Sequence, residues 1–472
     1  MGNKDAEISY CSINVSTGSV NDSFECMSDE QVSALISVST DVYASWRETS
    51  IEERANLVNK VAKIFEDRAE ELGALITNEM GKPLGEAREE ASFCGAIFRY
   101  FAQNAAELTS EEVLEETEEA ITVLERCPVG PLLGIMPWNY PYYQVARFVA
   151  PNLMLGNTII LKHSESVPKA ALRIQEIMEE AGIPKGVYQN IFADHQQISK
   201  IIDDPRVQGV SLTGSERAGA SVAAQSGKSL KKVVLELGGS DPYIVLSSDN
   251  IRQTVQDAIG IRLENTGQAC NSNKRIIVHA DIYNEFVAAA VEFVRQFKPS
   301  FPQRIEDPIG QKRFGPMSSE KALDQILKQI HAAKNAGATV HLGGQRAQGD
   351  FTEGYFLFPA VITGIPVGSD IYYEEFFGPV VTIYKAASDE QALKIANDTQ
   401  YGLGASVYAV EKGRAESIGN RLEAGMVGIN KQPPEAEDMP FGGVKRSGYG
   451  RELGRVGMDE FVNKKLVSRA KI

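Results

Sequence analysis

The sequence predicts an α/β protein built from parallel, doubly wound sheets, and three observations support this. From residue 131 onward, short apolar runs alternate with helical stretches, which is the β-α-β pattern. The 472 residues are too many for one simple core and suggest two or three domains. A hydrophobic content of 43% with 24% charged residues is ordinary for globular proteins and excludes wholesale disorder.

Composition excludes several classes of function. The chain has 48 Lys and Arg against 63 Asp and Glu, a formal net charge of −15, so neither nucleic acid nor an anionic membrane is expected as a partner. There is no run of 18 apolar residues, and the opening MGNKDAEISY lacks the apolar core of a signal peptide. The five cysteines are widely spaced, and neither they nor the scattered histidines indicate a disulfide framework or a metal site. A cytoplasmic protein without a metal is therefore expected.

The first part of the chain is predicted to be helical. Ser28 stands as an N-cap before apolar residues at helical spacing, and a later helix ends at Gly81. Residues 85–107 form a further candidate helix. The alternating region follows; its predicted strands are LLGIMP, NTIILK, VYQNIF, VQGVSL and VVLEL, and its predicted helices include YQVARFVAPNLMLG, PKAALRIQEIMEEAGIP, residues 196–202 and the segment after Gly214.

After residue 240 the alternation resumes, which predicts a second α/β domain. It includes the apolar runs PYIVL and RIIVHA, a helix through 251–265 and the helical segment DIYNEFVAAAVEFVRQF. Two isolated β-like segments remain, AITVLERCPV and the basic EFVNKKLVSRAKI near the end. We expect that each of them can pair across a subunit boundary.

Eight motifs occur in a fixed order along the chain. They are MPWNYP (136–141), SLTGSERAG (211–219), LELGGSDP (235–242), NTGQACNSNKR (265–275), EEFFGPV (374–380), YGLGASV (401–407), GMVGIN (425–430) and PFGGVKRSGYGRE (440–452). This ordered set resembles the aldehyde dehydrogenase superfamily, from about residue 40 to the end. The resemblance implies a cofactor-binding domain (1–112 and 131–238), a catalytic domain (239–453) and a small β extension (113–130 and 454–472). That extension would join subunits into a homodimer or homotetramer.

The resemblance implies a catalytic role for three residues. Cys270 is the expected nucleophile, although a lone cysteine is usually a small buried hydrophobe; it would add to the aldehyde carbonyl and give a thiohemiacetal, then a thioester. Glu236 ends an apolar strand, where a carboxylate must be paired or functional, and is the expected general base for hydrolysis. Asn139, with the backbone N–H of the nucleophile, would form the oxyanion hole.

The cofactor implied by the resemblance is NAD, with NADP as the alternative. Lys162 and Glu165 would hold the adenosine ribose, and a carboxylate there repels a 2′-phosphate, although Lys162 and Ser164 could rearrange to accept one. Gly214 and Ser215 open a helix whose N-terminus would bind the pyrophosphate. The remaining expected cofactor residues are Pro137, Trp138, Leu237, Gly238, Glu375 and Phe377.

Within the superfamily the strings LELGGSDPYIV and PFGGVKRSGYGREL are similar to bacterial succinate-semialdehyde dehydrogenases. That resemblance implies that Arg147 and Arg262 grip a distal carboxylate, with Tyr143 also lining the substrate site. Glu435 departs from the pattern, since a serine is expected there, and an acid would repel the substrate or pair with an arginine. Uncharged or other small aliphatic aldehydes therefore stay open as substrates. A thiol esterase or hydrolase and a non-catalytic NAD-binding protein are the competing functions.

Overall fold

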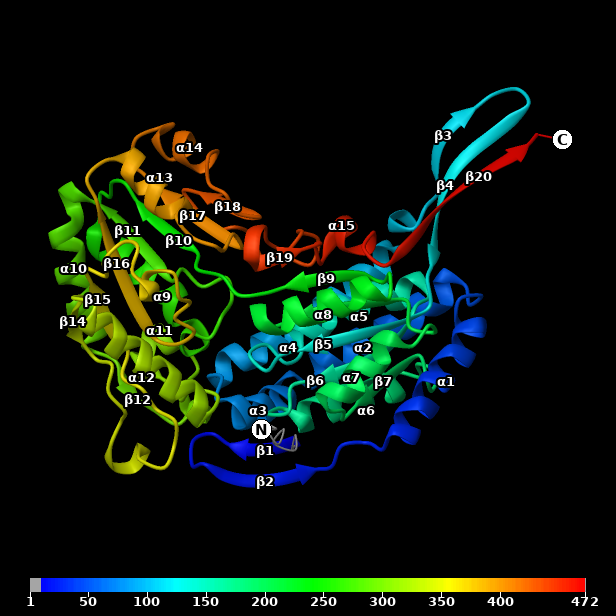
Figure 1. The fold of residues 1–472 in the computed structure, drawn as a ribbon, viewed down its shortest axis with the longest axis horizontal. Helices are drawn as coiled ribbons and strands as arrows, with labels where there is room; N and C mark the ends of the chain where they lie inside the picture. The colour runs from blue at the N-terminus through cyan, green and yellow to red at the C-terminus, as the bar shows by residue number, and fades with distance from the viewer. Residues whose placement is uncertain (1–9, 472) are drawn as a thin grey trace.

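The computed structural model describes residues 10–471, so the opening segment, for which no signal peptide is expected, and the last residue lie outside the described part. Figure 1 shows two large sheets side by side, each flanked by helices, and a thin β arm that projects from one of them. The described chain starts with a hairpin of β1 (Tyr10–Asn14) and β2 (Ser19–Phe24). No helix within residues 10–471 is long and apolar enough to cross a membrane.

Within the described residues, four helices precede the alternating region, where the sequence predicts three helical stretches; the second stretch is divided at Arg68. They are α1 (Asp29–Trp46), α2 (Ile51–Asp67), α3 (Ala69–Met80) and α4 (Leu84–Leu108). Ser28 caps α1 through a capping box with Gln31, which satisfies backbone N–H groups at the helix start. Gly81 ends α3 in the left-handed conformation (φ 83°), where an added Cβ would lie 2.8 Å from Pro316. The start at Ser28 and the stop at Gly81 are both confirmed.

In the described chain, the first large sheet has six strands in the order β19-β9-β8-β5-β6-β7. Its strands are β5 (Pro131–Met136), β6 (Thr158–His163), β7 (Tyr188–Ile191), β8 (Gly209–Thr213), β9 (Lys232–Glu236) and β19 (Gly448–Tyr449). The helices between them are α5 (Tyr143–Leu155), α6 (Pro168–Glu180), α7 (His195–Asp203) and α8 (Glu216–Lys228). All neighbouring strands are parallel except β19, which pairs with β9 antiparallel. The predicted strands and helices of this region are confirmed.

The second large sheet, again over residues 10–471, has seven strands in the order β14-β15-β16-β11-β10-β17-β18. Its strands are β10 (Pro242–Val245), β11 (Arg275–His279), β14 (Thr339–Leu342), β15 (Ala360–Thr363), β16 (Val380–Ala386), β17 (Gly404–Tyr408) and β18 (Met426–Ile429). The main helices around it are α9 (Ile251–Leu263), α10 (Ala280–Val294), α12 (Glu320–Asn335), α13 (Asp389–Asn397) and α14 (Arg414–Gly419). Only β14 runs antiparallel to its neighbour.

The projecting arm is a three-stranded sheet of described residues, in the order β20-β4-β3. It joins β3 (Glu112–Glu116) and β4 (Ala120–Pro128) to β20 (Val462–Ala470), near the other end of the chain. The two isolated β-like segments therefore pair with each other inside one chain, antiparallel and in register along nine residues of each strand. Both segments belong to the small β extension that the resemblance implies (113–130 and 454–472).

The two large sheets meet where the carboxyl ends of strands in the first sheet face the amino ends of strands in the second sheet. The carboxyl ends of β5, β6, β8 and β9 share one edge, because Met136 pairs with His163 and Thr213 pairs with Glu236. On the other side of the boundary lie the segments just before β11 and β16 of the second sheet. Asn139 donates across the boundary to the carbonyl of Gln268, in the segment before β11 (3.0 Å). Ligands of open α/β sheets bind at such carboxyl ends, so this boundary is the expected place for a site.

Candidate active site

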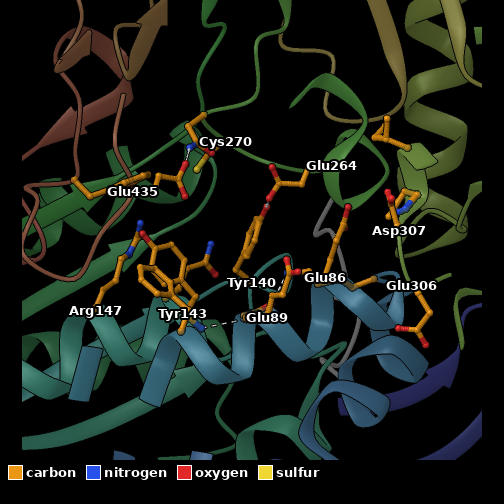
Figure 2. A pocket seen from close by; sticks show the side chains of 18 residues that line it. Glu86, Glu89, Tyr140, Tyr143, Arg147, Glu264, Cys270, Glu306, Asp307 and Glu435 are labelled. Atoms are coloured by element: carbon orange, nitrogen blue, oxygen red, sulfur yellow. Dashed lines mark hydrogen bonds and ion pairs between the residues drawn. The ribbon is translucent and has the colours of Figure 1, made fainter. Parts of the chain in front are cut away.

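A cavity of about 490 Å³ lies at this boundary, with Cys270 in its wall. Figure 2 shows side chains from α4 and α5 rising from below toward the Cys270 loop and the loop that carries Glu435. The lining is Lys82, Glu86, Glu89, Glu90, Phe93, Tyr140, Tyr143, Gln144, Arg147, Glu264, Cys270, Asn271, Glu306, Asp307, Pro308, Ile309, Glu435 and Phe441. A cavity of this size suits a small organic molecule.

The loop that carries Cys270 is held in a strained conformation. Asn265 and Thr266 both have positive φ (49° and 56°), which is unfavourable for a β-branched residue such as Thr266. Gly267 packs so closely that an added Cβ would lie 2.4 Å from the carbonyl oxygen of Gly378. The Asn265 side chain donates to the backbone oxygen of Asn139 at 2.8 Å. These contacts fix the loop against the first sheet and aim it at the cavity.

Cys270 is half-buried and packs against the apolar core of the first sheet. Burial raises the pKa of its thiol to about 12, and Arg147 and Lys274 only partly offset this. The thiol is therefore protonated at neutral pH in the resting protein. Lys274, itself 1% exposed, donates to the backbone oxygens of Ala269 (2.7 Å) and Cys270 (2.6 Å), so it positions the nucleophile's backbone.

Asn139 lies in the turn that follows β5, and its side chain is oriented by two neighbours. Gln144 donates to its Oδ1 (2.9 Å), and its Nδ2 donates to the carbonyl of Gln268 (3.0 Å). Oδ1 is thus occupied, and the second Nδ2 hydrogen remains for another acceptor. The side chain is 4% exposed, and the carbonyl that it contacts belongs to Gln268, two residues before the nucleophile in the sequence.

Glu236 is buried at the end of β9, and neither carboxylate oxygen has a hydrogen-bond partner among the described residues. Burial raises its pKa well above the usual range, the charge of Glu452 adds to this effect, and Arg147 opposes it. An added Cβ on Gly442 would lie 2.5 Å from its Oε1, so only glycine leaves room for this carboxyl group. It does not line the cavity itself, yet its charge raises the pKa of Cys270. An unpaired carboxyl with a raised pKa can hold and release a proton near the thiol.

Arg147 and Tyr143, both expected at the substrate site, line the cavity from α5. The Nε of Arg147 pairs with Glu452 at 2.8 Å, and its guanidinium lies 4.6 Å and 4.2 Å from the ring centres of Tyr143 and Phe441. Burial lowers the pKa of Arg147, but the negative groups around it, of which Glu452 has the largest effect, together outweigh burial and raise the pKa. Its Nη2 and the hydroxyl of Tyr143 have no hydrogen-bond partner in the described chain.

Arg262 does not reach the cavity, contrary to the expectation that it binds a substrate carboxylate. It is fully buried at the end of α9, and all of its N–H groups are engaged within the protein. Its acceptors are the backbone oxygens of Val380, Gly267, Phe376 and Gly378 and the hydroxyl of Ser272, at 2.6–3.1 Å. Arg262 therefore ties the Cys270 loop to the segment before β16, and its role is to position that loop.

The residues expected at the adenosine end lie together after β6. Lys162 and Glu165 form an ion pair, and this pair lowers the pKa of Glu165 although its burial acts in the opposite direction. Ser164 hydrogen-bonds Ser166 at 3.1 Å. These polar groups stand at the carboxyl edge of the sheet, where a ribose with two hydroxyls could replace their mutual contacts.

A dinucleotide fits the turn between β8 and α8. Ser215 caps α8 through Ala218 (3.3 Å), so the first N–H groups of this 13-residue helix point out of the turn at Gly214. The hydroxyl of Thr213 just before it is buried and has no hydrogen-bond partner among the described residues, so it is available to a pyrophosphate oxygen. Gly219 allows Leu237 to approach, since an added Cβ would lie 2.7 Å from that side chain. The turn thus suits a pyrophosphate without a glycine-rich loop.

The residues expected at the nicotinamide end of the cofactor also lie close together. Glu375 accepts from the backbone N–H of Gly239 (3.1 Å), and an added Cβ on Gly238 would lie 2.4 Å from its carboxylate. Phe377 meets Trp138 edge-to-face, with ring centres 5.8 Å apart, and Pro137 precedes Trp138 in the half-buried turn after β5. The chain thus brings together every expected cofactor residue along one edge of the first sheet.

Sequence reasoning missed several residues of this site. Lys274 bridges the Cys270 backbone to Glu375 at 3.1 Å, although it stands inside the quoted motif NTGQACNSNKR. Glu452 ends the last motif and reaches Arg147 only because β19 returns the segment after residue 440 to the first sheet. The catalytic domain was expected to run to residue 453, so this return departs from the expected division.

Three comparisons with known proteins show what the chain is similar to. A model of the aldehyde dehydrogenase family matches residues 3–467. Succinate-semialdehyde dehydrogenase (NADP(+)) of Deinococcus radiodurans is 43% identical over 97% of this chain and 94% of its own, and the enzyme of that name from Mycobacterium avium is 40% identical over 96% and 95%. A structure titled succinic semialdehyde dehydrogenase from Streptococcus pyogenes in complex with NADP+ is similar with a TM-score of 0.93 and 36% identity, covering 98% of this chain and 100% of that one.

The family match spans nearly the whole chain, and the fold, the cavity and the order of its motifs agree with it. The chain belongs to the aldehyde dehydrogenase family.

Proposed function

We propose that this protein oxidises an aldehyde to its carboxylic acid through a thioester on Cys270, with succinate semialdehyde as the substrate. The observation that carries the proposal is the placement of Cys270 in the wall of a cavity at the boundary where Asn139 and Glu236 also lie. The relatives named above carry succinate semialdehyde in their names, which supports the substrate.

NAD and NADP are the proposed cofactors. The relatives are named for NADP(+), while the carboxylate of Glu165 beside Lys162 favours a ribose without a 2′-phosphate. Lys162, Glu165, Gly214 and Ser215 would hold the dinucleotide, and Trp138, Glu375 and Phe377 would hold its nicotinamide end. When bound, the dinucleotide supplies the acceptor for the hydride that leaves the substrate carbon.

The chain's own residues perform the other steps. Cys270 loses its proton and adds to the carbonyl, and Nδ2 of Asn139 donates to the oxygen that becomes negative. After oxidation, Glu236 takes a proton from water so that the hydroxide attacks the thioester carbon. The acid then leaves and the Cys270 sulfur is free again. Burial disfavours the charged forms of both Cys270 and Glu236. The Cys270 thiol is therefore protonated in the free protein, and it must lose its proton as the cofactor and the aldehyde bind.

The substrate end is assigned to α5. The Nη2 of Arg147 and the hydroxyl of Tyr143 lack partners and are the donors that a distal carboxylate would accept from. A hydrolase that uses Cys270 would need an imidazole beside the thiol, and no histidine occurs among the residues that line the cavity in the described chain. Geometry therefore favours the dehydrogenase over this alternative.

The test is the absorbance at 340 nm after mixing the protein with succinate semialdehyde and either cofactor, compared with Cys270→Ser under the same conditions. Turnover by the native chain and its loss in the variant are expected. Ester hydrolysis without reduction of either cofactor would contradict the proposal.

We also infer that the six-stranded part binds the cofactor, that the seven-stranded part carries the nucleophile, and that the β arm joins subunits into a dimer or tetramer. The arm projects from the body in Figure 1, and the side chains of β3 are all exposed. An unpaired edge strand of this kind is a ready site for pairing with another chain. Sedimentation of the full chain and of a Val113→Lys, Leu114→Lys variant tests it: a monomeric native chain would contradict the inference.

A further inference from the structure

Two acids that lie one turn apart on α4 hold two different segments of the active site. Glu86 and Glu90 are four residues apart in the sequence, so they stand on the same face of the helix, about 6 Å apart along its axis. Both line the cavity around Cys270. Each of them accepts hydrogen bonds from a segment that carries a catalytic residue, and the two segments lie on opposite sides of the boundary between the large sheets.

Glu90 holds the start of α5. One of its carboxylate oxygens accepts from the backbone N–H groups of Tyr142 (2.8 Å) and Tyr143 (3.1 Å), the N-cap and first residues of that helix. The hydroxyl of Tyr142 donates to the backbone oxygen of Leu72, so this side chain does not cap its own helix. The other oxygen of Glu90 pairs with Lys82, and both side chains are almost fully buried. Glu90 therefore caps α5 from α4, at a helix end that favours a negative charge.

The start of α5 in turn orients the expected oxyanion donor. Gln144 is the second residue of α5, and its Nε2 donates to Oδ1 of Asn139 at 2.9 Å. Because Oδ1 is held in this way, the direction of Nδ2 follows the position of the helix start. Glu90 thus acts on Asn139 through Gln144.

Glu86 holds the loop that carries the nucleophile. It accepts from the backbone N–H of Asn265 at 2.8 Å, one of the two loop residues with positive φ. Figure 2 shows Glu86 pointing from α4 toward the segment of Glu264, the residue before Asn265. The side chain of Asn265 donates to the backbone oxygens of Asn139 (2.8 Å) and Gln268 (3.3 Å). The path from Glu86 therefore also reaches Asn139, from the other side of the boundary.

The place where the two paths meet is the oxyanion hole of the proposed reaction. Its two donors are the side chain of Asn139, which follows β5, and the backbone N–H of Cys270, which precedes β11. A misplacement of about 1 Å between catalytic groups can cost about 10²-fold in rate. A single helix that contacts both segments can keep their spacing constant.

We propose that Glu86 is a positioning residue of the oxyanion hole: from α4, where Glu90 already fixes the start of α5, it fixes the nucleophile loop and thereby the distance between Asn139 and Cys270. The proposal rests on the proposed function, because a negative oxygen forms only when the thiol adds to a carbonyl. The role requires the length of the Glu86 side chain rather than its charge. Burial raises the pKa of Glu86 to about 8, and the charge of Glu264 adds to this shift, so the neutral form is favoured at neutral pH.

The first experiment compares Glu86→Gln with Glu86→Asp. Glutamine keeps the length of the side chain and an acceptor oxygen, whereas aspartate keeps the acid but is shorter by one methylene, about 1.5 Å. Glu86 is half-buried, so both variants should fold, which the melting temperature checks. We expect kcat of Glu86→Gln to exceed that of Glu86→Asp by about tenfold to hundredfold. The KM for succinate semialdehyde and the affinity for the cofactor, measured by fluorescence titration, should differ by less than threefold between the two.

The matched control is Glu107→Asp, the same exchange at an exposed position near the other end of α4. It carries the same cost for the helix and should leave kcat within twofold of the native value. A higher kcat for Glu86→Asp than for Glu86→Gln would show that charge matters rather than length, and equal values would show that neither does. Either result would overturn the proposal.

The second experiment places Glu86→Asp in an Asn139→Ala background. A residue that acts through the oxyanion donor loses its effect once that donor is removed, so the further fall in kcat should be less than threefold. A merely structural role of Glu86 would lower kcat by the same factor in both backgrounds. Effects that multiply in full would therefore overturn the proposal.

The two proposals fail in different ways. Turnover of succinate semialdehyde by the native chain, with equal kcat for Glu86→Gln and Glu86→Asp, would leave the proposed function standing and remove this inference. No turnover of any aldehyde by the native chain would remove both.

Discussion

The role of Glu236 can be isolated by one substitution, Glu236→Gln. The native side chain is 2% exposed and neither carboxylate oxygen has a hydrogen-bond partner in the described chain. Burial raises its pKa, so the resting structure favours the neutral, protonated form of the carboxyl group. Glutamine has the same shape and charge as that resting form, so the free energy of unfolding should change by no more than about 1 kcal/mol, within the range of a neutral replacement.

Catalysis should respond very differently. A general base contributes about 10²- to 10⁴-fold to the rate, so kcat should fall by that factor, roughly 3–5 kcal/mol of barrier. Because the base acts after the hydride has left, the first turnover should still proceed. Rapid mixing with cofactor and aldehyde should then give a burst at 340 nm of about one reduced cofactor per site, followed by slow turnover.

The pH dependence supplies an independent check. Since Glu236 must be deprotonated to activate water, the native steady-state rate should rise as pH increases through its raised pKa, and this rise should be absent in Glu236→Gln. A variant that turns over within threefold of the native rate would refute the reasoning. Loss of the burst itself, with an unchanged melting temperature, would move the action of Glu236 to a step before hydride transfer.

The other predictions follow the same geometry. Asn139→Ala should lower kcat by about 10²- to 10³-fold without changing the affinity for the cofactor, measured by fluorescence titration, because it removes one oxyanion donor; an unchanged kcat would exclude that role. Alkylation of Cys270 by iodoacetamide should speed up about tenfold for each pH unit between 7 and 10, since the pKa of its thiol is raised to about 12 and only the thiolate reacts; a plateau below pH 9 would show a much lower pKa. Glu165→Gln should raise kcat/KM with NADP relative to NAD by roughly tenfold, since it removes a charge that repels the 2′-phosphate; an unchanged ratio would place that phosphate elsewhere.

The sequence predicts the regular parts of this fold well, for physical reasons. Strands such as VQGVSL are short apolar runs between turn residues, and Ser28 and Gly81 punctuate helices through local backbone chemistry that needs no tertiary contact. The pairing of β4 with β20 could not be read locally, because it joins segments more than 300 residues apart. For the same reason the two-residue strand β19, and with it the approach of Glu452 to Arg147, had no local signal.

The residues of the site also divide into those that the sequence predicts and those that it does not. Each of the motifs that contain Cys270, Asn139 and Glu236 can be recognised in the sequence by itself. The fold brings these three residues to one boundary. Arg262 was misjudged because its spacing from Cys270 says nothing about the direction of its side chain, which points inward and meets carbonyls from residues 376–380.

The central claim is that the carbon of the aldehyde becomes covalently bound to the sulfur of Cys270, and mass spectrometry tests it most directly. Glu236→Gln, mixed with cofactor and succinate semialdehyde and quenched in acid within the burst, should carry one acyl group per chain. After digestion that added mass should be found on the peptide containing Cys270. A burst of reduced cofactor with no added mass, or an acyl group on any other residue, would contradict the account.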